Sequence, residues 1–214
     1  MKTLRRTILV LSAATAAAFA QGWEFGGSGG GSFLNTVSVS SPAGSATAGF
    51  KPGAVVSGFA GFSQYKHIGG ELRYTFFQSN LSLKGGGAEA PGFSGQAHAI
   101  QYDVIFKTAK NESKVQFFAA VGGGMKVFRG TGTPSAYINV ASTYGYFTHT
   151  QEVKAMGSVG GGARFSLSKK VFLRTEIRDY ITAFPQKIIA PPAGFKYGSV
   201  LHDLVPMVTI GFDM

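Results

Sequence analysis

Apolar and polar side chains alternate through residues 69–77, and this alternation is the clearest structural signal in the chain. The residues of one parity are Leu72, Tyr74 and Phe76, and those of the other are Glu71, Arg73 and Thr75. Successive side chains of a β-strand point to opposite faces of the sheet. The pattern therefore predicts a strand with one apolar face and one charged face.

The same reading along the whole chain predicts eight strands, separated by segments rich in turn-forming residues. Their ranges are 23–32, 53–64, 68–80, 95–107, 115–129, 151–166, 171–184 and 199–212. These strands reach or exceed the roughly 9–11 residues that a tilted transmembrane strand needs. A strand in a soluble globular protein most often has only about 5–6 residues.

The segments between the predicted strands alternate in length. Short connections occupy 65–67, 108–113 and 167–170, and long ones occupy 33–52, 81–93, 130–150 and 185–198. Tight turns at one end and long loops at the other are typical of an up-and-down outer-membrane barrel. We therefore expect an all-β, eight-stranded antiparallel transmembrane β-barrel with short periplasmic turns and long extracellular loops.

In such a barrel the apolar parity faces lipid. Two of the predicted outward faces are Ile100, Tyr102, Val104 and Phe106, and Leu204, Val208, Ile210 and Phe212. Aromatic residues near strand ends predict interfacial girdles, and the candidates are Trp23, Phe25, Tyr65, Phe165 and Tyr180. The alternative is that these aromatic residues form the core of a soluble protein.

The opposite parity places charged side chains inside. The predicted inward acids are Glu24, Glu71, Asp103, Glu152, Glu176 and Asp203, and the predicted inward bases are Arg73, Lys107, Lys126, Lys154, Arg164, Arg174 and Arg178. Eight strands leave an interior that side chains can fill, and unpaired charges there are costly. We expect an ion-pair network, structural or gating, centred on Glu71, Arg73, Arg174, Glu176 and Arg178. Alternatively, these residues line a polar face that water solvates.

Residues 1–20 have the three parts of a secretory signal peptide. Lys2, Arg5 and Arg6 precede an apolar run, and Ala18 and Ala20 are the small residues that a signal peptidase reads. The run is shorter than the roughly 20 residues of a spanning helix, which argues against a membrane anchor. We expect cleavage after Ala20 and a barrel domain over residues 21–214. No later segment is suited to span a membrane as a helix, so a membrane-embedded chain must be a barrel.

Composition agrees with an exported membrane protein. Hydrophobic residues make up 44% of the chain and charged residues only 14%, against about 25% in typical soluble domains. Cysteine is absent. The formal net charge is +10, and without the three basic residues of the leader it is +7. Because the basic residues are scattered singly, we expect acidic lipid headgroups and no nucleic acid as partners.

The sequence offers little catalytic chemistry. Glycine triplets occur at 29–31, 122–124 and 160–162 without the Lys and Ser/Thr of a phosphate-binding loop, and they are better explained by strand bending and close packing. No histidine pair has metal-ligand spacing. His149 with Ser142 or Glu152 is the only local candidate for a catalytic group. We therefore expect no enzyme activity, no cofactor and no metal.

With these features the chain resembles the OmpA-like outer-membrane β-barrel family over residues 21–214. The resemblance rests on the leader, the eight strands, the Gly-Gly-Glu-Leu-Arg-Tyr strand at 69–74 and the ending Ile210-Gly211-Phe212. It implies an amino terminus and turns in the periplasm, loops outside the cell and an interior ion-pair network at the five residues named above.

Three features depart from the family pattern. Asp213 and Met214 follow the usual terminal aromatic residue, and Asp179 falls on the lipid-facing parity. Pro206 lies inside the last predicted strand, where it removes a ladder hydrogen bond, so we expect a bulge there.

The leading functional hypothesis is a monomeric, non-enzymatic barrel of the Gram-negative outer membrane with a structural or surface-interaction role. Its expected partners are outer-membrane lipids, lipopolysaccharide and an extracellular partner bound through the long loops. The alternatives are a narrow gated pore for ions or small solutes, an outer-membrane lipid-modifying enzyme, and a soluble periplasmic barrel that binds an apolar ligand.

Overall fold

The computed structural model describes residues 22–41, 44–63, 65–90, 92–108, 113–132, 144–191, 196–198 and 200–214. The predicted leader, its cleavage site and Ser142 lie outside these ranges. Within them, no helix has the length and apolar character that a membrane crossing requires.

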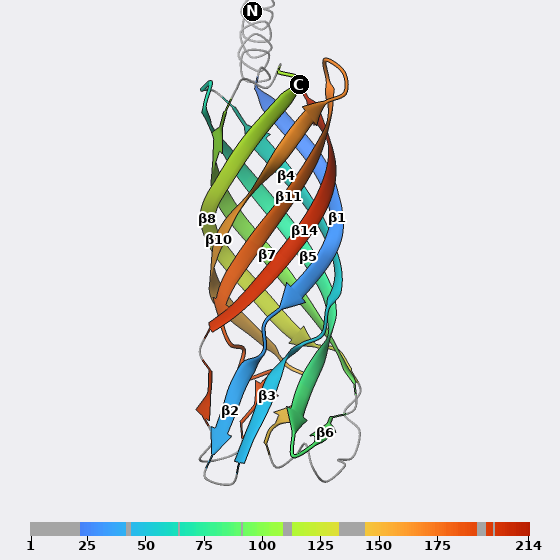
Figure 1. Cartoon of the computed structure of the whole chain (residues 1–214), viewed down its shortest axis with the longest axis vertical. Coiled ribbons are helices and arrows are strands. Elements are labelled where there is room, and N and C mark those ends of the chain that lie inside the picture. The colour runs from blue at the N-terminus through green and yellow to red at the C-terminus, as the bar shows by residue number, and fades with distance from the viewer. Residues whose placement is uncertain are drawn as a thin grey trace, which may run out of the picture.

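Eight long antiparallel strands form one closed sheet (Figure 1). They are β1 (Trp23–Leu34), β4 (Gly53–Phe62), β5 (Ile68–Gly85), β7 (Phe93–Lys107), β8 (Val115–Gly130), β10 (Gln151–Ser166), β11 (Val171–Ala183) and β14 (Val200–Asp213). Each strand pairs with the next along the chain, and β14 pairs with β1 to close the ring. The predicted eight-stranded antiparallel barrel is confirmed.

The pairing registers show how strongly the strands are staggered. The path of paired residues that leaves β1 at Glu24 passes through every strand and returns to β1 at Leu34, ten residues further along. Such a stagger tilts the strands and sets the barrel width. We call the end that carries Trp23 and Asp213 the termini end, and the opposite end the loop end (Figure 1).

The loop end carries a second, smaller layer of β-structure. Strands β2 (Val37–Ser41) and β3 (Gly44–Phe50) form a hairpin inside the segment that the sequence assigned to a loop, and β3 pairs with the last residues of β5. The sequence missed this hairpin because its residues are mainly small and serine-rich. The remaining short strands are β6 (Ala88–Glu89), β9 (Tyr146–Phe147), β12 (Ile189–Ala190) and β13 (Lys196–Tyr197).

A hydrophobic core joins this layer to the barrel mouth. Its fully buried residues include Val39, Ala48, Leu83, Ile188 and Leu201. The Tyr197 hydroxyl donates a hydrogen bond to the Tyr144 carbonyl at 3.0 Å, and burial raises the pKa of Tyr197 above its usual range. The loop end is therefore a packed layer in which apolar side chains cover the barrel opening.

The predicted sorting of barrel faces holds with one exception. One large apolar residue from each barrel strand illustrates the outward belt, with 40–62% exposure: Phe25, Val56, Leu72, Ile100, Phe117, Val159, Ile177 and Ile210. The assignment of Tyr180 to an aromatic girdle was wrong. Tyr180 is fully buried and packs edge-on against Phe77, because its position has the inward parity of β11.

The expected bulge at Pro206 is absent. The β11–β14 register is continuous through the pair Ile177–Pro206. In the β1–β14 ladder the register is the same before and after the proline. Only the Cα pairs 31–206 and 32–205 are missing from that ladder. Because proline has no N–H, the ladder loses pairing locally, but no extra residue shifts the strand.

Glycine at the inward position 160 makes room for an interior arginine. A Cβ at Gly160 would lie 2.8 Å from Arg178 Cγ and 2.6 Å from the Ile177 carbonyl oxygen, whereas a Cβ at the outward Gly157 would meet nothing within 4 Å. We expect Gly160→Val to destabilise the barrel by about 1–3 kcal/mol, since overpacking displaces neighbouring groups.

Urea titration of the folded fraction measures this effect, and Gly157→Val in the same strand is the matched control. An equal fall of the urea midpoint in both variants would show that crowding of the interior at position 160 is not the cause, since valine has a higher β-propensity than glycine.

Candidate functional site in the barrel interior

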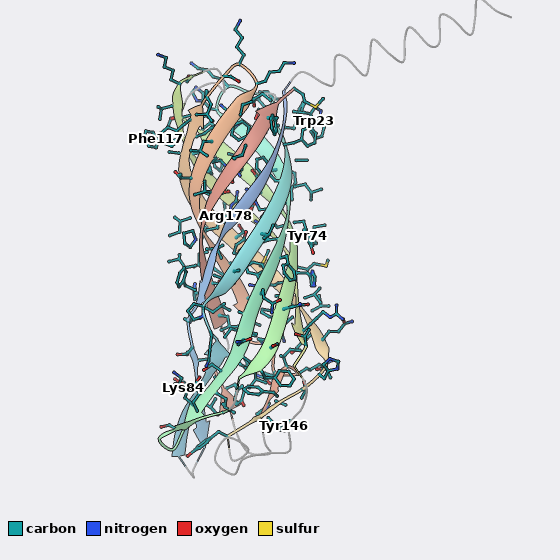
Figure 2. The ribbon with its side chains drawn as sticks, turned by 90° about the vertical axis from the view of Figure 1, so that its right-hand side faces the viewer. Trp23, Tyr74, Lys84, Phe117, Tyr146 and Arg178 are labelled. Atoms are coloured by element: carbon teal, nitrogen blue, oxygen red, sulfur yellow. The ribbon has the colours of Figure 1, made fainter. Side chains whose placement is uncertain are left out.

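Two strands on opposite walls of the barrel carry the predicted site residues. Glu71 and Arg73 belong to β5, whereas Arg174, Glu176 and Arg178 belong to β11. Three strands separate β5 from β11 in either direction around the ring. Because every second residue points inward, these long side chains meet across the interior, and Figure 2 shows Arg178 there.

The Glu71 carboxylate contacts three arginines. Its Oε1 accepts hydrogen bonds from Arg73 Nε and Arg178 Nη2, each at 2.8 Å, and its Oε2 accepts one from Arg174 Nη2 at 2.8 Å. The first bond lies within β5, and the other two cross the lumen to β11.

Glu176 binds the same three arginines from the other wall. Its Oε1 lies 2.9 Å from Arg73 Nη2 and 3.2 Å from Arg174 Nη2, and its Oε2 lies 2.9 Å from Arg178 Nε. The structure thus brings all five predicted residues into one network in which each carboxylate is shared by three guanidinium groups.

Asp103 on β7 completes the network. Its Oδ2 lies 2.5 Å from Arg178 Nη1. The sequence assigned Asp103 to the interior but not to the centre of the network, because strand parity gives the face of a residue and not its partners. With Asp103 included, three arginines oppose three carboxylates, and we call these six residues the ionic cluster.

The ionic cluster is almost completely shielded from solvent. Side-chain exposure is 3% for Arg174 and at most 1% for the other five members. A buried charge without a partner is strongly unfavourable, so multiple short contacts are needed to offset the lost hydration. Two of these charges also bind polar neighbours: Arg73 Nη1 donates to Ser57 Oγ at 3.1 Å, and Thr209 Oγ1 donates to Glu176 Oε1 at 3.3 Å.

Two phenylalanines that the sequence did not single out pack on the guanidinium groups. Arg174 Cζ lies 4.3 Å from the ring centre of Phe59 and 4.9 Å from that of Phe118, and Arg73 Cζ lies 5.0 Å from Phe59. Such stacking stabilises a desolvated cation. Phe59 and Phe118 have the inward parity of their strands, which is the sequence signal for this contact.

Further buried ion pairs lie outside the ionic cluster. Lys107 Nζ lies 3.1 Å from Glu24 Oε1, and Arg164 pairs with Asp213. Lys126 Nζ lies 2.6 Å from Asp203 Oδ2, and Ser32 Oγ donates to Asp203 Oδ1 at 2.6 Å. The predicted inward residues Glu152 and Lys154 pair with each other where β10 begins, and they are only partly buried.

Apolar side chains fill the barrel on the loop side of the Lys126–Asp203 pair. Lys126 Nζ lies 3.7 Å from the ring centre of Phe77 and 5.7 Å from that of Tyr180. Phe128, Met156 and Leu201 are buried with them in the core that continues into the loop-end layer. The interior is therefore ionic at its centre and apolar towards the loop end.

The candidate catalytic group gains no support from the geometry. The Glu152 carboxylate binds Lys154 and accepts the amide of Lys187 at 2.7 Å, while His149 is exposed. Among the described residues no group of three or more acidic or histidine side chains could hold a metal ion.

Comparison with known proteins supports the fold. No family model and no curated protein sequence matches the chain. The outer-membrane protein OprG from Pseudomonas aeruginosa superposes with a TM-score of 0.57 at 12% identity, covering 90% of this chain and 96% of that one. Neisserial surface protein A superposes with a TM-score of 0.50 at 13% identity, covering 89% and 97%. At these identities the likeness is one of fold alone.

Removing one carboxylate tests the ionic cluster. We expect Glu71→Leu to destabilise the folded barrel by about 3–5 kcal/mol, because three buried arginines would share two carboxylates. The measurement is the urea midpoint of the folded fraction.

Glu89→Gln is the control, since Glu89 is a partly exposed carboxylate that also contacts two bases, Lys51 at 2.8 Å and Lys84 at 3.5 Å. We expect its midpoint to match that of the native chain. Equal midpoints for Glu71→Leu and Glu89→Gln would instead favour a solvated interior.

Proposed function

We propose that this chain is a monomeric, non-enzymatic barrel of the outer membrane with a structural or surface-interaction role. Residues 1–20 direct its export and are removed, and residues 21–214 form the barrel. The observation that carries the proposal is the arrangement of the two faces: large apolar residues are exposed around all eight strands, while charges are buried at the centre.

This arrangement argues against the soluble alternative. A soluble barrel that binds an apolar ligand keeps its apolar face inside and its polar face in water. Here the centre of the interior holds six charged groups, and Leu72, Tyr102, Phe117 and Ile210 are each more than half exposed. A contiguous apolar surface of this extent is stable only when lipid or another apolar phase covers it.

The proposed orientation places the termini end in the periplasm and the loop-end layer outside the cell. A chain that enters the outer membrane from the periplasm keeps its two termini on that side if the strand number is even. The loop-end layer then meets lipopolysaccharide and any extracellular partner. Because the closed sheet has no free edge within the barrel, we propose that it works as a monomer.

The packed interior favours a structural role over a pore. The ionic cluster bridges β5 and β11 across the lumen, and the apolar core beyond it includes Phe77, Phe128 and Tyr180. An ion would have to displace both. The catalytic alternative loses support from Glu152, because its carboxylate binds Lys154 and the amide of Lys187.

Heat-modifiability on detergent gels tests the membrane barrel. We expect the protein to fractionate with outer membranes and to migrate differently before and after boiling, because the closed hydrogen-bonded ladder resists the detergent. A soluble protein without a mobility shift would contradict the proposal and point to an interior ligand site.

Planar bilayer recordings separate the structural role from the pore. We expect no channel steps from the native barrel, since side chains occupy its lumen. Arg174→Glu, which inverts one charge of the ionic cluster, is the companion variant. Sustained conductance of the native chain that changes in Arg174→Glu would favour the pore alternative.

A further inference from the structure

Two neighbouring turns at the termini end bring three lysines together. Residues 167–170 connect β10 and β11 and contain Lys169 and Lys170, and Lys114 directly precedes β8. The Ser166 amide donates to the Lys114 carbonyl at 3.0 Å, which fixes the two turns side by side. The Ser168 hydroxyl accepts the amides of Lys170 at 3.3 Å and Val171 at 3.1 Å, so the second turn has a defined backbone.

These three lysines form no ion pair within the described residues, and all three are exposed. Two carboxylates that the structure describes at this end have other partners, since Glu24 binds Lys107 and Asp213 binds Arg164. The terminal residue Met214 lies against β1, because its amide donates to the Trp23 carbonyl at 2.9 Å. Within the described part of the chain, the three lysines therefore present positive charge that no carboxylate pairs with.

An exposed apolar surface adjoins the lysines on the outer wall. Val115, Phe117, Phe165 and Leu167 are 46%, 60%, 36% and 64% exposed. Val115 pairs with Phe165 in the β8–β10 ladder, and Phe117 lies one outward position further along β8. Figure 2 shows Phe117 near the end from which several nitrogen-tipped side chains project.

We propose that Lys114, Lys169 and Lys170 bind the phosphate of an anionic phospholipid in the leaflet at the termini end, with its acyl chains against Val115, Phe117 and Phe165. The inference rests on the proposed function, because it needs a membrane-embedded barrel. The lysines lie in the turns and the apolar residues lie next to them on the outer wall. A lipid has the same order, with the headgroup at the membrane surface and the acyl chains below it. Lysines at an anionic membrane surface add attraction that increases with their number.

Native mass spectrometry of the barrel folded in zwitterionic micelles tests the site. The probes are phosphatidylglycerol and phosphatidylcholine with the same acyl chains, each added in turn. We expect the native barrel to prefer phosphatidylglycerol. The triple variant Lys114→Gln, Lys169→Gln and Lys170→Gln is expected to bind it about 10- to 100-fold more weakly, with phosphatidylcholine binding unchanged.

Lys66→Gln is the matched control, because Lys66 is exposed in the β4–β5 turn at the same end but lies away from the three lysines. It should retain the native preference. The gel-mobility shift on boiling is recorded for every variant to show that it is folded. A folded variant that no longer binds phosphatidylglycerol then identifies the substituted lysines as the site.

Three outcomes overturn the inference. The first is that the folded native barrel binds the two lipids equally, and the second is that the triple variant and Lys66→Gln lose the same amount of phosphatidylglycerol binding. The third is that glycerol 3-phosphate, which lacks acyl chains, displaces phosphatidylglycerol as well as phosphatidylglycerol itself does. Each leaves the proposed function standing. A chain that stays soluble without detergent overturns the proposed function itself.

Discussion

Closure of the sheet between β1 and β14 is the constraint on which the rest of the structure depends. In lipid every backbone N–H and C=O must find a partner within the protein, and only a closed ladder leaves no edge. Closure with a ten-residue stagger also fixes which residues share a level of the lumen. It places β5 and β11 opposite each other, so that Glu71 and Arg178 meet across the interior at 2.8 Å. Even at Pro206, where pairing with β1 is interrupted, the register stays unchanged.

A closed barrel of eight strands is narrow. Its inward side chains must therefore balance one another in charge and must also fit the small volume of the lumen. The ionic cluster satisfies the first requirement with three cations and three anions. Inward glycines such as Gly160 satisfy the second, because the backbone of one strand approaches the arginine side chain of the next. The other triplets serve the same close approach with different neighbours, since Gly122 faces Asp103 and Gly124 faces Gln101.

Strand parity explains why so much of the fold was predictable from the sequence. A period of two fixes the face of every residue once a strand is recognised, so Glu71, Arg73, Arg174, Glu176 and Arg178 could be assigned to the interior without knowing the register. Partner identity needs the register, which is why the bond between Arg178 and Asp103 was not foreseen. Tyr180 lies near a strand end, as girdle aromatics do, but its parity turns it inward. The β2–β3 hairpin was missed because its pattern is weak and its stability comes from packing on Leu81 and Leu83.

The interior pairing also determines where the net charge of the protein can lie. The buried bases of the barrel are paired with acids: the ionic cluster is neutral, Lys107 and Lys126 pair with buried carboxylates, and Arg164 pairs with the partly exposed Asp213. Residues 21–214 carry a net charge of +7, and these paired interior groups contribute none of it. Unpaired charge is stable only beside water or anionic groups, whereas the outward apolar belt excludes it. With the barrel placed in a membrane as proposed, the same rule that requires a neutral lumen leaves the two rims of the barrel as the places where the excess of lysine meets the membrane surface.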